Sequence, residues 1–315
     1  MVSYVRENAA SEVEAISERR RPSFVLRRMA RHRWAYLFIA PFFVLFAVFM
    51  LYPIGFSFWM SFNDWSGLGD MRFVGLDNFR RVIGDGVFWN SMRNALIIFF
   101  LYVPIMTFLA IVFAVLLSAG YVRLQGMWRA IIFLPFVTNM VAVGFVFQLM
   151  FDTNAGAVNG ALKAIGIGPV PWLSEPMLAR VTLGLLMIWA WVGYNTVIML
   201  AGVQSIPREI FEAAKVDGAG PVQTLFRVTI PLLKPVIIFS VTLSVIGTFN
   251  MFTEPFILTE GGPLRATETP VMQIFSNTFQ NLRFGYAAAI SYFYLAVIIV
   301  VTLVQFRLAS RGAAR

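Results

Sequence analysis

Six long apolar stretches, separated by polar segments, restrict this chain to a membrane fold. A helix needs about 20 predominantly apolar residues to cross the hydrocarbon core of a bilayer. With 59% hydrophobic and 13% charged residues, the chain is far more apolar than a soluble domain, in which about 25% of residues are charged. We therefore predict an all-α, polytopic membrane protein with six transmembrane helices. The stretches lie at about residues 34–60, 94–119, 130–151, 178–203, 236–258 and 286–306.

The basic residues are distributed unequally over the polar segments. If the N-terminus lies inside, 17 of the 25 basic residues fall on the inner side, as the positive-inside rule expects. Topology therefore explains the net charge of +9, and binding to nucleic acid is not predicted. The pattern divides the chain into a cytoplasmic N-terminal tail (1–33), a membrane domain (34–308) and a cytoplasmic C-terminal tail (309–315).

Two of the outer segments carry the pattern of short helices. The segment LDNFRRVI (76–83) is amphipathic, and the segment 156–167 is rich in alanine and glycine. We predict a small helix in each of them, outside the six spans.

The sequence contains no pattern for chemistry on this chain. Cysteine is absent, and the single histidine, His32, lies in a cluster of arginines. There is no GxxxxGK[ST] phosphate-binding loop, no GxGxxG motif after a strand and no HExxH metal motif. The chain is therefore not predicted to be an enzyme, and it carries no predicted cofactor or metal site. Any use of ATP would need a separate ATPase subunit.

The segment 205–235, SIPREIFEAAKVDGAGPVQTLFRVTIPLLKP, is the longest patterned polar segment between two apolar stretches. It predicts two short helices joined by a tight turn. Pro207 suits a first helical position, where its missing N–H costs nothing. Gly218 suits the left-handed conformation that often ends a helix. A second helix is predicted to start at Pro221 and to be stopped by Pro231 and Pro235.

This segment resembles the EAA signature of the membrane subunits of binding-protein-dependent ABC importers. The matching residues are Glu212-Ala213-Ala214, Gly218, Ile230-Pro231 and Lys234-Pro235. The flanking runs AGVQSIP (201–207), GGP (261–263), FVGLDNF (73–79) and RAIIFLPFV (129–137) are similar to runs of the carbohydrate branch, which includes maltose, lactose and glycerol-phosphate permeases. The resemblance covers roughly residues 34–308. It implies the type I ABC importer permease fold.

The resemblance also implies an assembly. Members of this importer family pair with a second, homologous permease and with two ATPase subunits, which hold ATP and magnesium. An extracytoplasmic binding protein delivers the substrate to this complex in the bacterial cytoplasmic (inner) membrane, where both permease termini are cytoplasmic. The residues implied in coupling to the ATPase are Glu212, Ala213, Ala214, Asp217, Gly218 and Pro231.

Polar and aromatic side chains gather in the fourth and fifth apolar stretches. Carbohydrates are bound by aromatic faces and uncharged hydrogen-bonding groups, and maltose-type permeases line their sugar site from these two helices. Gly247, Asn250 and Glu254 are predicted to share one face of the fifth helix. Packing between helices is the alternative role for each residue. The candidates for a sugar site are Trp191, Tyr194, Asn195, Ser244, Gly247, Thr248, Asn250, Met251 and Glu254.

The predicted function is a permease subunit of an ATP-driven importer for a sugar. Thr248 and Met251 stand where maltose-type permeases have asparagines, so the identity of the sugar is not predicted. One alternative is a glycerol-phosphate permease of the same family. Another is an ion-coupled secondary transporter, because a carboxyl group such as that of Glu254 is costly inside a membrane and suggests a function there. A scaffold that only anchors an ATPase is a third.

Overall fold

The computed structural model describes residues 33–118 and 124–311, and the side chains of residues 308–311 are excluded. Almost all of the predicted N-terminal tail lies outside the described residues, as does most of the C-terminal tail. The chain divides into two units, Met1–Trp59 and Met60–Arg315. The helices of the first stretch are α3 (Arg33–Phe46), the π-helical turn η1 (Ala47–Leu51) and α4 (Tyr52–Met60), which together form a span of 28 residues.

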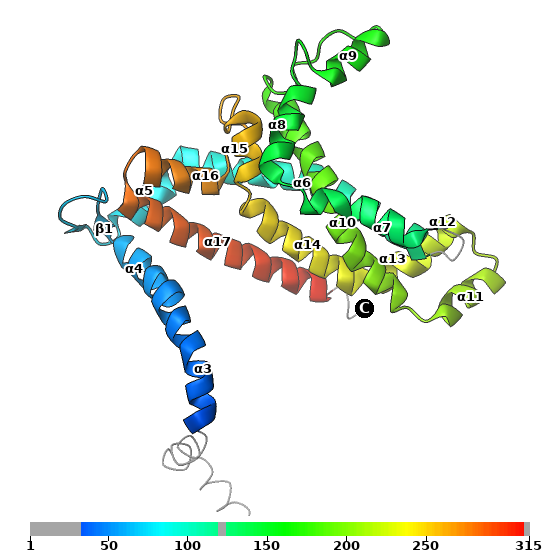
Figure 1. Cartoon of the computed structure of the whole chain (residues 1–315), viewed down its shortest axis with the longest axis horizontal. Coiled ribbons are helices and arrows are strands. Elements are labelled where there is room, and N and C mark those ends of the chain that lie inside the picture. The colour runs from blue at the N-terminus through cyan, green and yellow to red at the C-terminus, as the bar shows by residue number, and fades with distance from the viewer. Residues whose placement is uncertain (1–32, 119–123, 312–315) are drawn as a thin grey trace, which may run out of the picture. The chain divides into compact units, whose positions relative to one another are not determined.

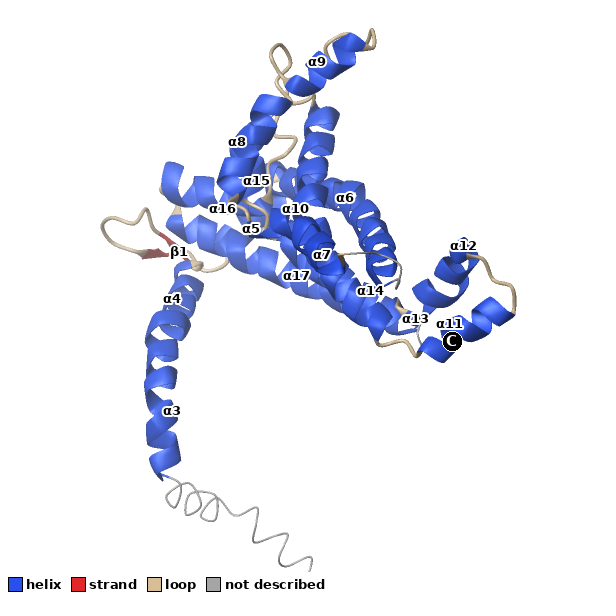
Figure 2. Cartoon of the chain, turned by 45° about the vertical axis from the view of Figure 1, so that its right-hand side comes forward, coloured by secondary structure: helices blue, strands red, loops and turns tan. Residues whose placement is uncertain are grey.

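The second unit is helical apart from one small hairpin in its described residues (Figures 1 and 2). The strands β1 (Asn63–Asp64) and β2 (Arg72–Phe73) pair antiparallel, and α5 (Asp77–Gly84) follows them. The side-chain amide of Asn78 donates to the carbonyls of Ser61 and Asn63, at 3.0 and 2.9 Å, and so ties α5 to the segment before it. The predicted helix at 76–83 is confirmed.

Two long helices form the centre of this unit: α6 (Gly86–Ser118) and α10 (Pro176–Gln204) pack against each other. The buried core falls into three clusters, and α6 contributes to each of them, through Phe88, Ile98 and Ala110 among others. Its buried residues recur from Phe88 to Leu117, while other apolar side chains of the same helix, such as Phe100, are exposed. α6 begins earlier than the predicted residue 94, because its first two turns carry polar residues beyond the apolar stretch.

The third apolar stretch is not one straight helix. It is divided into α7 (Gln125–Phe133), the 3-10 turn η2 (Leu134–Val137) and α8 (Met140–Met150), with a bend of 90°. Thr138 and Asn139 are extended at the break, and the side chain of Asn139 accepts from the N–H groups of Val141 and Ala142. The break thus ends one helix and caps the next. The small helix predicted within 156–167 is confirmed as α9 (Ala157–Ala164).

A bend of 72° separates the helical run Pro221–Leu232 from α14 (Lys234–Phe249), the helix of the fifth stretch, and α14 ends earlier than predicted. The prediction of a helix to residue 258 is wrong, because a separate helix, α15 (Thr253–Thr259), follows a break. Pro255 has no N–H to donate to the carbonyl of Met251, four residues before it. That carbonyl instead accepts a hydrogen bond from the hydroxyl of Thr269 at 2.8 Å.

The chain ends with α16 (Pro270–Phe275), the π-helical turn η4 (Ser276–Gln280) and α17 (Phe284–Arg311). α17 packs against α5, α14 and α16. Among the described residues, four helices are long and apolar enough to span a membrane. The number of spans rises to six if each of the two bent helix pairs also forms one span. The six predicted spans agree with the upper count, and the fifth begins and ends earlier than predicted.

Candidate functional site

The 205–235 loop contains the two short helices that its sequence predicts. The first is α11 (Arg208–Val216), which begins directly after Pro207, so that this proline precedes the helix rather than opening it. Glu209 lies in the first turn and Lys215 in the last, where each complements the helix dipole. Glu212 and Ala213 are exposed, whereas Ala214 is buried.

The turn after α11 is closed by glycine. Gly218 has a φ of +77°, and its N–H bonds to the carbonyl of Lys215 at 3.1 Å. The N–H of Ala219 returns to the carbonyl of Ala214 at 2.9 Å, as in a Schellman-type C-cap. Asp217 and Gly218 are both exposed. The predicted left-handed conformation of Gly218 is therefore confirmed.

The second helix of the loop differs from the prediction. It starts at Pro221 as α12 (Pro221–Thr224) and continues through the π-helical turn η3 (Leu225–Thr229) into α13 (Ile230–Leu232). Pro231 lies inside α13, and Pro235 lies in the first turn of α14 instead of stopping a helix. Pro235 occupies a starting turn, in which no N–H is needed, whereas Pro231 lies near the end of the continuous helical run that begins at Pro221. The break falls at Leu233, which is buried.

The 205–235 loop also presents apolar side chains to its surroundings. Val216 is 87% exposed, and Val222 and Phe226 are exposed as well. These three side chains lie on both sides of the turn at Gly218.

A small cavity lies between α6, α10 and α14. Its volume is about 40 Å³, and a single water needs about 10–15 Å³. It therefore has room for a few waters and not for a sugar ring. Of the predicted site residues, five line it together: Trp191, Tyr194, Asn195, Ser244 and Gly247.

Four further residues line this cavity and were missed from the sequence. They are Tyr102 and Met106 of α6, Met187 of α10 and Leu243 of α14. Helix α6 gives no amphipathic signal, because it is apolar all round. The hydroxyl group of Tyr102 within an apolar stretch was the only sign in the sequence that α6 lines a cavity.

Buried hydrogen bonds connect the three helices around the cavity. The Thr248 hydroxyl donates to the carbonyl of Ser244 at 2.7 Å, so its single proton is used there. Tyr102 must then donate to Thr248, across 2.5 Å between α6 and α14. Ser240 donates to the Asn195 side-chain oxygen at 2.5 Å, which joins α14 to α10. Thr248 therefore holds helices together and does not line the cavity.

Aromatic rings cover one side of the cavity. The ring of Tyr194 stacks on Phe136 of η2, with centroids 4.8 Å apart, and Trp191 meets Phe136 edge to face at 5.3 Å. Within the described residues the indole Nε1 of Trp191 is buried without a hydrogen-bond partner. An unpaired buried donor that close to a cavity can bind a polar guest.

The remaining predicted residues lie outside this cavity. Met251 is buried in the apolar core. Asn250 follows the last residue of α14, is exposed and donates to the carbonyl of Ile246 at 2.8 Å. Glu254 is buried in α15. Because the helix ends at Phe249, Gly247, Asn250 and Glu254 do not share one helical face, and that prediction is wrong.

Comparison with known proteins decides the family. Residues 88–312 match the family model described as "binding-protein-dependent transport system inner membrane component". The chain belongs to this family. It is thus the membrane permease of a transport system, and not an enzyme. The match includes the 205–235 loop and every residue that lines the cavity.

Several transport permeases are similar to this one over most of its length. The lactose transport system permease LacF of Rhizobium radiobacter is 41% identical over 86% of this chain and 92% of its own. The arabinooligosaccharide permease AraP of Halalkalibacterium halodurans is 36% identical, over 86% and 85%. The trehalose/maltose permease MalF of Thermococcus litoralis is 31% identical, over 86% and 92%.

The fold of the permease is also found among solved structures. A chain of a bacterial ABC transporter involved in the import of the acidic polysaccharide alginate superimposes with a TM-score of 0.78. The superposition covers 91% of this chain and 98% of the other, at 23% identity, and so shows a shared fold. The same fold is present in the alginate transporter in complex with an alginate pentasaccharide-bound periplasmic protein.

Proposed function

We propose that this permease carries an oligosaccharide or a related small carbohydrate across the cytoplasmic membrane as part of an ATP-driven importer. The observation that carries the proposal is the similarity, over 86% of the chain, to permeases for lactose, arabinooligosaccharides and trehalose/maltose. None of the described residues that line the cavity is cationic, which favours an uncharged sugar over a glycerol phosphate.

The 205–235 loop is proposed to couple the permease to its ATPase. Glu212 and Ala213 lie on an exposed surface of α11, and the apolar side chains of Val216 and Phe226 are exposed on the same loop. A docked ATPase would bury these groups. ATP and magnesium then belong to that partner, and this chain needs no cofactor of its own.

The size of the cavity implies that other parts complete the sugar site. A cavity of about 40 Å³ cannot enclose a sugar, so binding requires the three helices to separate or a second permease to provide the other wall. We propose a heterodimer with a homologous permease, which receives sugar from a binding protein. Closure of the ATPases would then switch the permease pair between an outward-facing and an inward-facing state.

Tyr194→Ala should weaken transport without disturbing assembly. Loss of the ring removes a stacking face beside the cavity and should cost about 1–3 kcal/mol, or roughly one to two decades in the half-saturation of uptake. Tyr194→Phe keeps the stack on Phe136 and should retain most of the activity. The measurement is uptake of lactose, arabinotriose and maltotriose in cells that carry the full importer. Equal half-saturation in wild type and Tyr194→Ala would exclude this cavity as the sugar site.

The absence of cysteine from the chain allows a direct test of topology. Asp217→Cys lies in the 205–235 loop and Asp70→Cys in the segment after the first span, and both side chains are exposed. A membrane-impermeant maleimide should label Asp70→Cys in intact cells and Asp217→Cys only after lysis. The reverse pattern would place the 205–235 loop outside and remove the ATPase from its proposed position.

A further inference from the structure

A second cavity, far larger than the first, lies at the opposite end of the helices from the 205–235 loop. Its volume is about 950 Å³. Val87, at the start of α6, lines it, whereas Ser118, at the end of α6, lines a different cavity beside α11 and α12. Since a helix of 33 residues is about 50 Å long, the two ends are separated by the thickness of a membrane.

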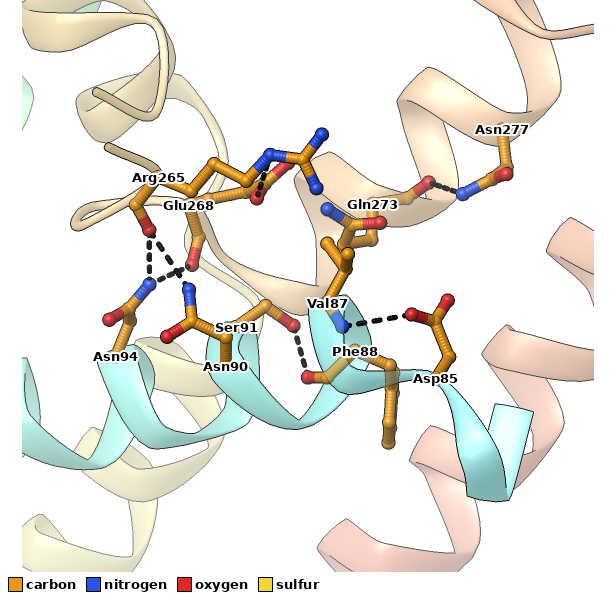
Figure 3. A network of polar contacts seen from close by, with 10 residues as sticks. All are labelled: Asp85, Val87, Phe88, Asn90, Ser91, Asn94, Arg265, Glu268, Gln273 and Asn277. Carbon is orange, nitrogen blue, oxygen red and sulfur yellow. Dashed lines mark hydrogen bonds and ion pairs between the residues drawn. The ribbon is translucent and has the colours of Figure 1, made fainter. Parts of the chain in front are cut away.

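The wall of this cavity is held in place by buried polar contacts (Figure 3). The side-chain amide of Asn94 donates to the carbonyls of Arg265 and Glu268, at 2.6 and 3.1 Å. The guanidinium of Arg180 donates to the carbonyl of Ala266 and to the side-chain oxygen of Asn94, at 2.9 Å each. The loop before α16 is thus fixed to both α6 and α10. A wall fixed in this way can present its other side chains in a defined arrangement.

The side chains that face this cavity combine donors and acceptors with little net charge. Three arginines and three carboxylates line it, and the amides of Gln273, Asn277, Gln280 and Asn281 lie among them. Opposite charges in equal number give no preference for a strongly charged ligand. The mixture of amide, guanidinium and carboxylate groups suits a ligand that both donates and accepts many hydrogen bonds.

One oxygen atom of a carboxylate in this wall lacks a hydrogen bond. Within the described residues the Oε2 atom of Glu268 is buried without a hydrogen-bond partner, and Arg265 Nε lies 3.8 Å away, within ion-pair range only. Burial raises the pKa of the Glu268 carboxyl, against the opposing effects of Arg265 and of a hydrogen bond from the Gln273 side chain. A buried acceptor without a donor is costly, and a ligand hydroxyl would satisfy it.

Aromatic rings are present in the same cavity. Phe256 and Phe275 meet edge to face at 5.7 Å, and both line the cavity together with Tyr286. Aromatic rings give an apolar surface to the C–H side of a sugar ring, while its hydroxyl groups reach the polar wall.

We propose that this cavity is a second carbohydrate-binding site, which holds a neutral sugar before it reaches the cavity between α6, α10 and α14. This inference rests on the proposed function and adds a separate site to it. Val87 and Tyr102 line the two cavities from one helix, 15 residues apart, which corresponds to about 22 Å. A small sugar therefore occupies one site at a time.

The test uses cysteine protection in the full importer, purified into lipid nanodiscs without its binding protein. Gln280→Cys lines the large cavity and is exposed, and Asp70→Cys is an exposed control that does not line it. The rate of maleimide labelling is measured with and without lactose, arabinotriose or maltotriose. A sugar that cells take up should slow the labelling of Gln280→Cys several-fold and leave Asp70→Cys unchanged.

Two further variants separate the sites. Adding Glu268→Gln should raise the sugar concentration needed for protection several-fold, because it replaces an acceptor oxygen by a donor. Adding Tyr194→Ala should leave protection unchanged, because that ring lines the smaller cavity.

Three results would overturn the inference. One is a sugar that is taken up but does not slow the labelling of Gln280→Cys. Another is protection when the sugar-free binding protein is added back, with none from sugar alone, which would show a surface for protein docking. If none of the sugars is taken up and none protects, the proposed function fails together with this inference.

Discussion

Replacing Gly218 by valine should abolish coupled transport while the permease still inserts into the membrane. Gly218 has a φ of +77°, a conformation that β-branched residues resist at a cost of about 1–3 kcal/mol. A Cβ atom at this position would meet no atom within 4 Å, so the effect comes from the backbone and not from a clash. The turn would relax by changing the direction of α11, and the exposed surface around Glu212 would no longer fit its ATPase.

The measurement is co-purification of the ATPase with Gly218→Val, together with ATP hydrolysis that depends on the binding protein and sugar. Gly218→Asn is the matched control, because asparagine tolerates the left-handed conformation, and it should retain both activities. Gly220→Ala has an ordinary negative φ and should be neutral. Normal transport by Gly218→Val, with its ATPase bound, would show that this turn is not the coupling element.

Replacing Gly193 by alanine should destabilise the permease as a whole. A Cβ atom on Gly193 would lie 2.0 Å from the carbonyl oxygen of Ile132 and 2.9 Å from the Cα of Phe133. Both neighbours are backbone atoms, so helices α10 and α7 would have to separate. Overpacking of this kind costs about 1–3 kcal/mol or more. It would also move Phe136 away from Tyr194 and open the aromatic side of the small cavity.

Gly184→Ala is the control, because it lies on the same helix and its Cβ atom would meet side chains at ordinary contact distances of 3.7 and 3.8 Å. We expect a clear loss of membrane-inserted protein and a lower unfolding temperature in detergent for Gly193→Ala, and little change for Gly184→Ala. Equal stability of the two variants would mean that α7 does not approach α10 as closely as described.

The apolar stretches and the short-range patterns of the chain could be interpreted without a structure. The six spans, the small helix at 157–164 and the left-handed turn at Gly218 are properties of local sequence. Each depends on hydrophobic length, on residues within one helical turn, or on the conformational freedom of a single residue. The EAA pattern, which indicated the family, is likewise a pattern of residues that are close together in the sequence.

Only the tertiary structure decided which of the predicted residues meet. Tyr102 reaches Thr248 from a position 146 residues earlier in the chain, and no periodicity within either helix predicts that contact. The break after Phe249 is local, but it is stabilised by a residue of the next segment. The Met251 carbonyl, which Pro255 leaves free, accepts a hydrogen bond from Thr269, 18 residues later. Side-chain period and propensity act over a few residues, whereas a cavity forms where helices distant in sequence pack imperfectly. For this reason the sequence predicted the first short helix of the loop and the turn at Gly218, whereas only the packed helices show which residues line each cavity.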